Sequence, residues 1–241
     1  MTRYFLEVAY KGTAYSGFQL QENAQTIQEE VEIAFKTLQL ASVSMTGSSR
    51  TDAGVHACQN FFHFDYDHSL HEQFVYKMNA ILPSDIVIRG VKEVAADAHC
   101  RFDALYRTYC YYLYKSKDPF LDDRAWYFPY RLNQDLLNQA AALLLTYQDF
   151  TSFSKRNTQV KTFICQISES NWIENKDYFI YKVKANRFLR GMVRALVSTM
   201  LLVGRGKLTI QEFKTIIESK DCTKASFAAP AHGLFLEEVI Y

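Results

Sequence analysis

The run Gly47-Ser48-Ser49-Arg50-Thr51-Asp52-Ala53-Gly54-Val55-His56-Ala57 brings a guanidinium, a hydroxyl and a carboxylate together in consecutive residues. Small residues on both sides of Asp52 let another surface come close, and Gly54 can take a backbone angle that other residues avoid. A polar turn between two strands, closed by Gly47 and Gly54, would use many of the same residue types. Folding alone does not require an arginine, a threonine and an aspartate together, so Asp52 is a candidate reactive carboxylate.

Three arginines lie on a helix that the sequence predicts from Asn186 to Val203. On a helical wheel Arg187, Arg190 and Arg194 fall within a narrow arc, and most of the remaining circumference is apolar, as in buried helices. An unpaired buried charge is very costly, so these arginines need anionic partners. Glutamates at a domain interface would serve for all three, and Asp52 is the alternative partner of Arg194.

A tyrosine-rich strand, expected over 105–114, carries the next candidate. Strand alternation puts Tyr109 and Tyr111 on one face and Cys110 and Tyr112 on the other. A tyrosine in such a run is ordinarily a core or edge aromatic. A phenol can also stack on a pyrimidine while its hydroxyl reaches a polar edge, so Tyr109 is a candidate base-binding residue.

A further cluster of polar residues offers a rival chemistry. His63, Asp65, Asp67, His68 and His71 lie within nine residues of one another. The first three share the polar face of a predicted strand, and no spacing such as H-E-x-x-H appears. We therefore interpret this cluster as the solvated face of a strand in preference to a metal site. No G-x-x-x-x-G-K-[ST] or G-x-G-x-x-G loop is present either, so no metal or nucleotide cofactor is expected.

The string S-R-T-D-A-G-V-H-A at 49–57 resembles the signature of the TruA family of pseudouridine synthases, and other segments extend this resemblance nearly end to end. In that family the aspartate of R-T-D-A-G-V-H is the catalytic nucleophile. Residues 184–194 resemble K-A-N-x-F-x-x-x-M-V-R, which implies that Arg194 pairs with Asp52. Residues 101–109 are similar to the A-R-F-S-A-x-x-R-x-Y block, which implies that Tyr109 lies against the target base. The G-L-x-L match at 233–236 implies that Leu234 lines the uracil pocket.

The resemblance implies a tRNA pseudouridine synthase that acts on uridines 38, 39 and 40 of the anticodon arm. This isomerase breaks the N-glycosidic bond of uridine and rejoins C5 to C1′. The base keeps its atoms, so no cofactor or metal is needed. The resemblance also implies a homodimer with one tRNA spanning both subunits. Because flipping a nucleotide loses its stacking, Arg50 is expected to help by taking the place of the extruded nucleotide.

Two other functions compete with this interpretation. A non-catalytic RNA-binding module could use the same fold, since fold does not decide function. A metal-dependent nuclease could use the cluster from His63 to His71. The intact R-T-D-A-G-V-H favours the synthase, because a pure binder has no need for Asp52. The segment from Tyr10 to Gln19 departs from the family pattern Y-D-G-x-x-Y-x-G-W-Q at Lys11 and Phe18, which affects expectations about RNA contacts more than the reaction.

The element order predicts an α+β fold. Strands are expected at 3–10, 43–45, 59–67, 86–94, 105–114, 162–173, 178–185 and 233–241, and helices at 26–38, 70–82, 133–145, 186–203 and 210–218. The first part of the chain then reads βαββαβ, and the second repeats this order with one further helix, at 210–218. We expect two tandem ferredoxin-like halves, 1–100 and 101–241, with mainly antiparallel sheets related by a pseudo-twofold around a central cleft.

Composition limits the class of protein. The chain has 241 residues, of which 49% are hydrophobic, enough for a sizeable core. A net charge of +1 argues mildly against a nucleic-acid binder, but residues 178–211 carry seven basic side chains and no Asp or Glu. Five cysteines, an odd number without C-x-x-C spacing, read as reduced thiols. No signal peptide or membrane segment is evident, so we expect a cytoplasmic protein.

Overall fold

The chain divides into two compact units. The computed structural model describes residues 1–156 and 160–241. The first unit comprises Met1–Leu105 and Phe235–Tyr241, and the second comprises Tyr106–Leu234. Compared with the predicted halves 1–100 and 101–241, residues 101–105 and the last strand group by their contacts with the first unit. The mixed α+β class is confirmed, with mostly antiparallel strand pairs. The twofold relation between tandem halves stays a prediction.

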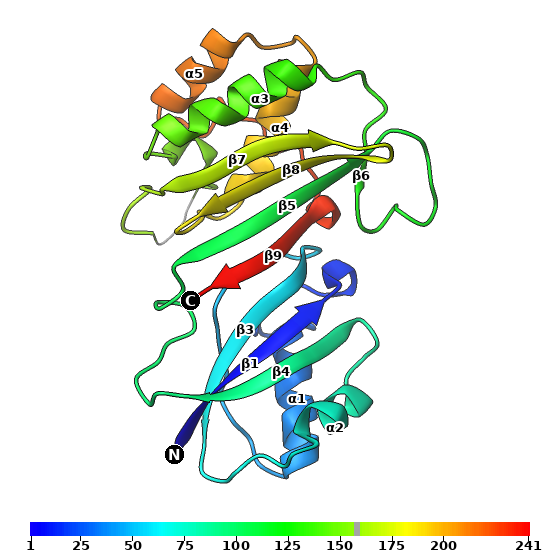
Figure 1. Cartoon of the computed structure of the whole chain (residues 1–241), viewed down its shortest axis with the longest axis vertical. Coiled ribbons are helices and arrows are strands. Elements are labelled where there is room, and N and C mark those ends of the chain that lie inside the picture. Colours follow the sequence, from blue (N-terminus) through cyan, green and yellow to red (C-terminus); the bar gives the residue numbers. More distant parts are fainter. Residues whose placement is uncertain (157–159) are drawn as a thin grey trace. The chain divides into compact units, whose positions relative to one another are not determined.

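The first unit has the βαββαβ element order, and its helices cover one face of its sheet (Figure 1). The elements are β1 (Thr2–Tyr10), α1 (Ile27–Gln39), β2 (Thr46–Gly47), β3 (His56–Tyr66), α2 (Phe74–Ile81) and β4 (Ile86–Val94), with β9 (Leu234–Ile240) added from the chain end. The strand order is β4-β1-β3-β9, and β2 also pairs with β3. All pairs are antiparallel except β3 with β9, where His56 lies opposite Phe235. Both ends of the loop between β2 and β3 are therefore fixed in one sheet.

Aromatic side chains fill the space between the helices and sheet of the first unit. Phe62 and Phe64 lie on the same face of β3, and both are buried. The Phe35 ring on α1 meets Phe64 edge-on at 5.1 Å between ring centroids. The Phe18 ring stacks on Phe62 at 4.6 Å. Phe18 belongs to the loop after β1, so this core anchors that loop as well as the helices.

The second unit is a sheet covered on one face by three helices (Figure 1). Its elements are β5 (Tyr106–Tyr114), β6 (Trp126–Tyr127), α3 (Gln134–Leu143), β7 (Ile167–Glu174), β8 (Tyr178–Ala185), α4 (Met192–Gly204) and α5 (Ile210–Glu218). Strand β8 pairs antiparallel with β5 on one side and β7 on the other, and short β6 pairs parallel with β5. The register sets Tyr109 opposite Val183 and Tyr111 opposite Tyr181. These residues share one face of the sheet.

The predicted start of α4 at Asn186 is wrong. The Asn186 side chain accepts a hydrogen bond from the backbone N–H of Gln166 at 2.8 Å and does not cap a helix. Gly191 then adopts φ +74°, a left-handed conformation that interrupts a helix, and α4 begins at Met192. Arg187 and Arg190 precede the helix, so they do not share a helical face with Arg194. The prediction that α4 is buried almost all round is confirmed.

Several other predicted boundaries change, and local hydrogen bonds explain two of them. Helix α2 begins at Phe74 and not at residue 70, because the Phe74 N–H closes a turn onto the His71 carbonyl. The short strand expected at 43–45 forms at Thr46–Gly47, since the Met45 N–H is taken by the Glu32 side chain. Strand β7 begins at Ile167. No helix in the described part of the chain is long and apolar enough to cross a membrane.

Candidate active site

Asp52 lies at the centre of a tightly turned loop that joins β2 to β3. The Asp52 residue is half-buried, its neighbour Thr51 is buried and Ala53 is exposed. The Val55 N–H donates to the Asp52 carbonyl at 3.1 Å, and Gly54 takes φ +78° within this turn. The loop thus presents the aspartate at its surface while the residues beside it are anchored. We call residues 48–55 the Asp52 loop.

A buried asparagine fastens the Asp52 loop to β3. Asn60 is 0% exposed, and its Oδ1 accepts from the Ser49 N–H at 3.2 Å while its Nδ2 donates to the Ser49 carbonyl at 2.8 Å. The same Nδ2 also donates to the Tyr10 hydroxyl at 3.2 Å. That hydroxyl in turn bonds the Thr51 hydroxyl at 2.8 Å. The Ser49 backbone and the Thr51 side chain, both shortly before Asp52, are therefore held by buried groups.

The sequence analysis did not identify Asn60, although a signal was present. Asn60 occupies the same strand face as Phe62 and Phe64, so it is a polar residue at an apolar position of the alternation. Buried polar groups are almost always hydrogen-bonded, so such an exception indicates a bonding role. Asn60 is a positioning residue for the Asp52 loop.

The segment after β1 braces the Asp52 loop from another side, and two glycines allow this close approach. A Cβ added at Gly12 would lie 2.0 Å from the Val55 carbonyl oxygen. At Gly17, which adopts φ +114°, it would lie 3.2 Å from the Thr51 carbonyl oxygen. The Phe18 N–H donates to that same Thr51 oxygen at 3.1 Å. The backbone of residues 12–18 therefore packs directly against the loop.

His56, the last residue of R-T-D-A-G-V-H, is buried and holds neighbouring segments together. It is 1% exposed, and its Nδ1 accepts from the Gly12 N–H at 3.1 Å. Its ring stacks on Phe235 of β9 at 4.5 Å between centroids. Accepting at Nδ1 fixes the orientation of the imidazole. His56 thus links the loop after β1 and the last strand to the Asp52 loop.

Tyr109 lies in the second unit, on the same face of β5 as the fully buried Tyr111. It is 9% exposed, and its ring meets Phe188 edge-on at 5.0 Å between centroids. Phe188 belongs to the segment before α4 that carries the predicted K-A-N-x-F pattern. The structure therefore joins two of the segments that the sequence analysis singled out, through aromatic packing.

Arg194 and Leu234 are linked by residues 229–233, which we call the strap. Arg194 Nε donates to the Ala229 carbonyl at 2.7 Å, and the Tyr111 hydroxyl donates to the Pro230 carbonyl at 2.8 Å. A Cβ added at Gly233 would lie 2.7 Å from Tyr111 Cζ. Burial raises the pKa of Tyr111, so its phenol stays a hydrogen-bond donor. Leu234 follows the strap directly and is buried.

Of the predicted site residues, Arg50 and Asp52 therefore share a loop in the first unit, whereas Tyr109, Arg194 and Leu234 belong to the second. The pairing of Arg194 with Asp52 stays a prediction. Within the second unit, the strap and β5 tie the elements that carry Tyr109, Arg194 and Leu234. Tyr111 is a positioning residue that sequence analysis put on the same face as Tyr109 without assigning it a role.

The basic segment 178–211 is spread over several elements of the second unit. Lys182 forms an ion pair with Glu169 of β7 at 3.0 Å, an interaction between partly exposed side chains. The Lys184 ammonium lies 5.1 Å from the Tyr106 ring centroid. The Arg205 guanidinium stacks on Tyr130 at 3.7 Å from its centroid. Cationic groups on aromatic rings suit nucleic-acid surfaces, although such pairs are also common in proteins generally.

The residues of the rival His63 cluster have other partners. His63 Nδ1 lies 3.2 Å from Cys100 Sγ, and Asp65 forms two hydrogen bonds with Arg3 at 2.7 and 2.8 Å. Burial lowers the pKa of His63, the nearby His99 and Arg3 lower it further, and Asp65 and Asp103 oppose this change. Among the described residues, no three His, Cys, Asp or Glu side chains are grouped closely enough to hold a metal ion.

Comparison with known proteins assigns the chain to a family. The sequence model of the tRNA pseudouridine synthase family matches residues 7–103 and 140–241. Proteins named tRNA pseudouridine synthase A from Porphyromonas gingivalis and Parabacteroides distasonis are 46% and 43% identical to the chain, cover all of it, and are themselves matched over 98% and 96% of their length. One from Staphylococcus aureus strain MRSA252 is 37% identical over 98% of the chain and 91% of its own length. The chain therefore belongs to the tRNA pseudouridine synthase family, a family of isomerases that act on tRNA.

Proposed function

We propose that the chain isomerises uridine to pseudouridine at positions 38, 39 and 40 of the tRNA anticodon arm, with Asp52 as the nucleophile. The uracil must leave its sugar, rotate while it is held, and rejoin through C5. This sequence of events requires a carboxylate of fixed position and a pocket that holds a flat base. Family membership supports the reaction, and the intact R-T-D-A-G-V-H supports Asp52.

The observation that carries the proposal is the bracing of the Asp52 loop. Buried groups on β1 and β3, namely Tyr10 and Asn60, bond the residues immediately before Asp52, and the backbone near Gly17 packs on the loop. Catalytic groups gain most when their geometry is fixed before the substrate arrives. An ordinary surface turn does not need such a set of buried hydrogen bonds to its backbone and side chains, so the bracing supports a carboxylate held in a fixed position.

The remaining residues have separate roles in this proposal. Tyr109 stacks against the target base, and Leu234 lines the pocket around it. Arg194 pairs with the Asp52 carboxylate and favours its ionised form. Arg50, which is exposed on the same loop as Asp52, takes the place of the extruded nucleotide and offsets part of the lost stacking.

The chain acts in the cytoplasm as a homodimer that binds one tRNA across both subunits. The basic side chains of residues 178–211 supply the phosphate contacts that a net charge of +1 does not reveal. Light scattering of the free protein and of its tRNA complex gives their molar masses and therefore tests whether the protein is a dimer. A monomer in both samples would remove this part of the proposal and leave the reaction untouched.

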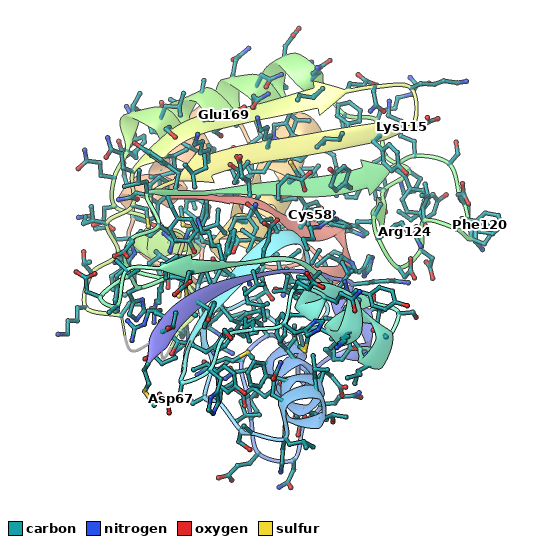
Figure 2. All side chains as sticks on the ribbon, turned by 60° about the horizontal axis from the view of Figure 1, so that its bottom comes forward. Cys58, Asp67, Lys115, Phe120, Arg124 and Glu169 are labelled. Carbon is teal, nitrogen blue, oxygen red and sulfur yellow. The ribbon has the colours of Figure 1, made fainter. Side chains whose placement is uncertain are left out.

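Tritium release tests the reaction and the nucleophile together. tRNA transcripts that carry C5-tritiated uridine lose the label when C5 bonds to C1′. We expect release by the wild type, none by Asp52→Asn, and normal release by Asp67→Asn, a matched variant of an exposed aspartate on the same unit (Figure 2). Transcripts with a single uridine at 38, 39 or 40 test the positions. tRNA binding by the wild type without release would leave only an RNA-binding protein.

A further inference from the structure

A pocket of about 480 Å³ lies in the first unit, beside the Asp52 loop. This volume is within the range of about 300–1,000 Å³ that is usual for small-molecule sites. Most of its lining comes from residues 18–20 and 44–47 and from His99, Arg101 and Phe102. Arg50 also lines the pocket, whereas Asp52 does not. Two residues of extended chain span at most about 7 Å, so the backbone of Arg50 lies within that distance of the backbone of Asp52.

One wall of the pocket carries an aromatic ring that is unusually open. The Phe102 residue is 74% exposed, and the His99 ring packs against it at 4.2 Å between centroids. His99 Nδ1 accepts from the Arg101 N–H at 3.2 Å, and the Phe102 N–H donates to the His99 carbonyl at 3.1 Å. The Asp103 carboxylate accepts the His99 N–H at 2.7 Å. This tight turn holds the phenyl ring in place on the surface.

The charge of the pocket is positive. Arg50 and Arg101 line it from two different segments of the first unit, and its lining residues include no Asp or Glu. The Arg101 guanidinium lies 5.7 Å from the Phe102 centroid, so a cation and an exposed aromatic residue line the pocket side by side. Gln19 and Gln28 add amide groups to the lining. A phosphate beside a flat base fits this combination of groups.

We infer that this pocket binds a second nucleotide of the substrate tRNA, a neighbour of the target uridine. Its base stacks on Phe102, and its phosphate lies between Arg101 and Arg50. Single-stranded bases are held by aromatic stacking and arginine contacts of this kind. The inference rests on the proposed function and extends it, because it gives the enzyme a site that reads the RNA beside the reacting base.

A double-mutant cycle between the protein and the RNA tests the inference. Binding constants are measured for full-length wild type and Phe102→Ala with anticodon stem-loop RNAs in which each unpaired nucleotide in turn is abasic. Stacking on an aromatic side chain is worth about 5- to 150-fold in affinity per base. We expect Phe102→Ala to weaken binding of the intact RNA by that factor. At one RNA position, removal of the base should weaken binding to the wild type but should not weaken binding to Phe102→Ala any further. Phe102→Trp should restore both affinity and coupling.

The matched control is Phe120→Ala, since Phe120 is 80% exposed on the loop between β5 and β6 and does not line the pocket (Figure 2). Arg101→Ala should lower the slope of log Kd against log salt by about one, and Arg89→Ala, an exposed arginine on β4, should not. Equal effects of Phe102→Ala and Phe120→Ala, or additive effects at every RNA position, would overturn the inference. Coupling at Phe102 without tritium release by the wild type would instead reject the proposed reaction and keep the pocket as an RNA site.

Discussion

Replacing Gly17 with alanine tests whether the segment after β1 positions Asp52. Gly17 adopts φ +114°, and residues other than glycine pay about 1–3 kcal/mol for such a backbone angle. The added Cβ would also lie 3.2 Å from the Thr51 carbonyl oxygen, closer than ordinary van der Waals contact. That oxygen accepts the Phe18 N–H, so relief of the contact must shift the peptide that directly precedes Asp52.

We expect two measurable losses from Gly17→Ala. The free energy of unfolding should fall by about 1–3 kcal/mol, which lowers Tm by about 2–4 °C for each kcal/mol in a chain of this size. A misplacement of about 1 Å can cost about 100-fold in rate, so a shift of a few tenths of an ångström should lower kcat about 10-fold. Thermal unfolding and single-turnover tritium release measure the two effects separately.

Gly206→Ala is the matched control for Gly17→Ala. Gly206 also has a positive φ, +69°, but an added Cβ would meet no atom within 4 Å. We expect this variant to lose about 1–2 kcal/mol of stability and to keep the wild-type kcat. The reasoning is refuted if Gly17→Ala is destabilised yet turns over at the wild-type rate, or if Gly206→Ala loses the same activity.

Three further predictions concern Asn60, His63 and Ser48 of the first unit. Asn60→Ala leaves both backbone groups of Ser49 without their buried partner and should cost about 2–4 kcal/mol in urea unfolding; a loss below 1 kcal/mol would contradict the bracing role. Burial lowers the pKa of His63, so the unfolded chain binds the proton first and stability should fall as the pH drops below about 6.5. His63→Gln should flatten this fall between about pH 7 and 5, with His232, whose pKa burial also lowers, contributing the rest; an unchanged slope would speak against it. The Ser48 hydroxyl is buried and has no hydrogen-bond partner among the described residues, so Ser48→Ala should raise stability by about 1 kcal/mol, and a lower Tm would show that the hydroxyl is satisfied.

Local features of the chain determined much of the fold. Thr26 caps α1, with its hydroxyl accepting the Glu29 N–H at 3.3 Å, and Thr209 with Glu212 forms a full capping box on α5. The alternation along β3 puts Phe62 and Phe64 on one face of the strand, and both are buried. These elements depend on capping residues and periodicities that span only a few consecutive residues, so they can be recognised in the sequence itself. The resemblance around Asp52 likewise needed only consecutive residues, and family membership confirmed it.

Other features depended on partners far away in the sequence. Periodicity predicted a helix from residue 186, but Asn186 bonds Gln166 across the sheet and Gly191 turns the chain before α4. The last strand was predicted as a strand, yet its parallel pairing with β3 joins residues that are about 180 positions apart. No local pattern specifies such a partner, because many strands present the same backbone groups.

The candidate site shows the same division between local and tertiary information. The sequence alone identified Asp52, Arg50, Tyr109, Arg194 and Leu234 as candidates, since each belongs to a short recognisable string. Only the tertiary structure assigned the bracing role of Asn60 and the strap between Arg194 and Leu234. A buried polar side chain is defined by which groups it meets after folding, and those groups come from separate strands and loops. Residue type and spacing determined the chemistry available to this protein, and long-range packing decided which groups hold that chemistry in position.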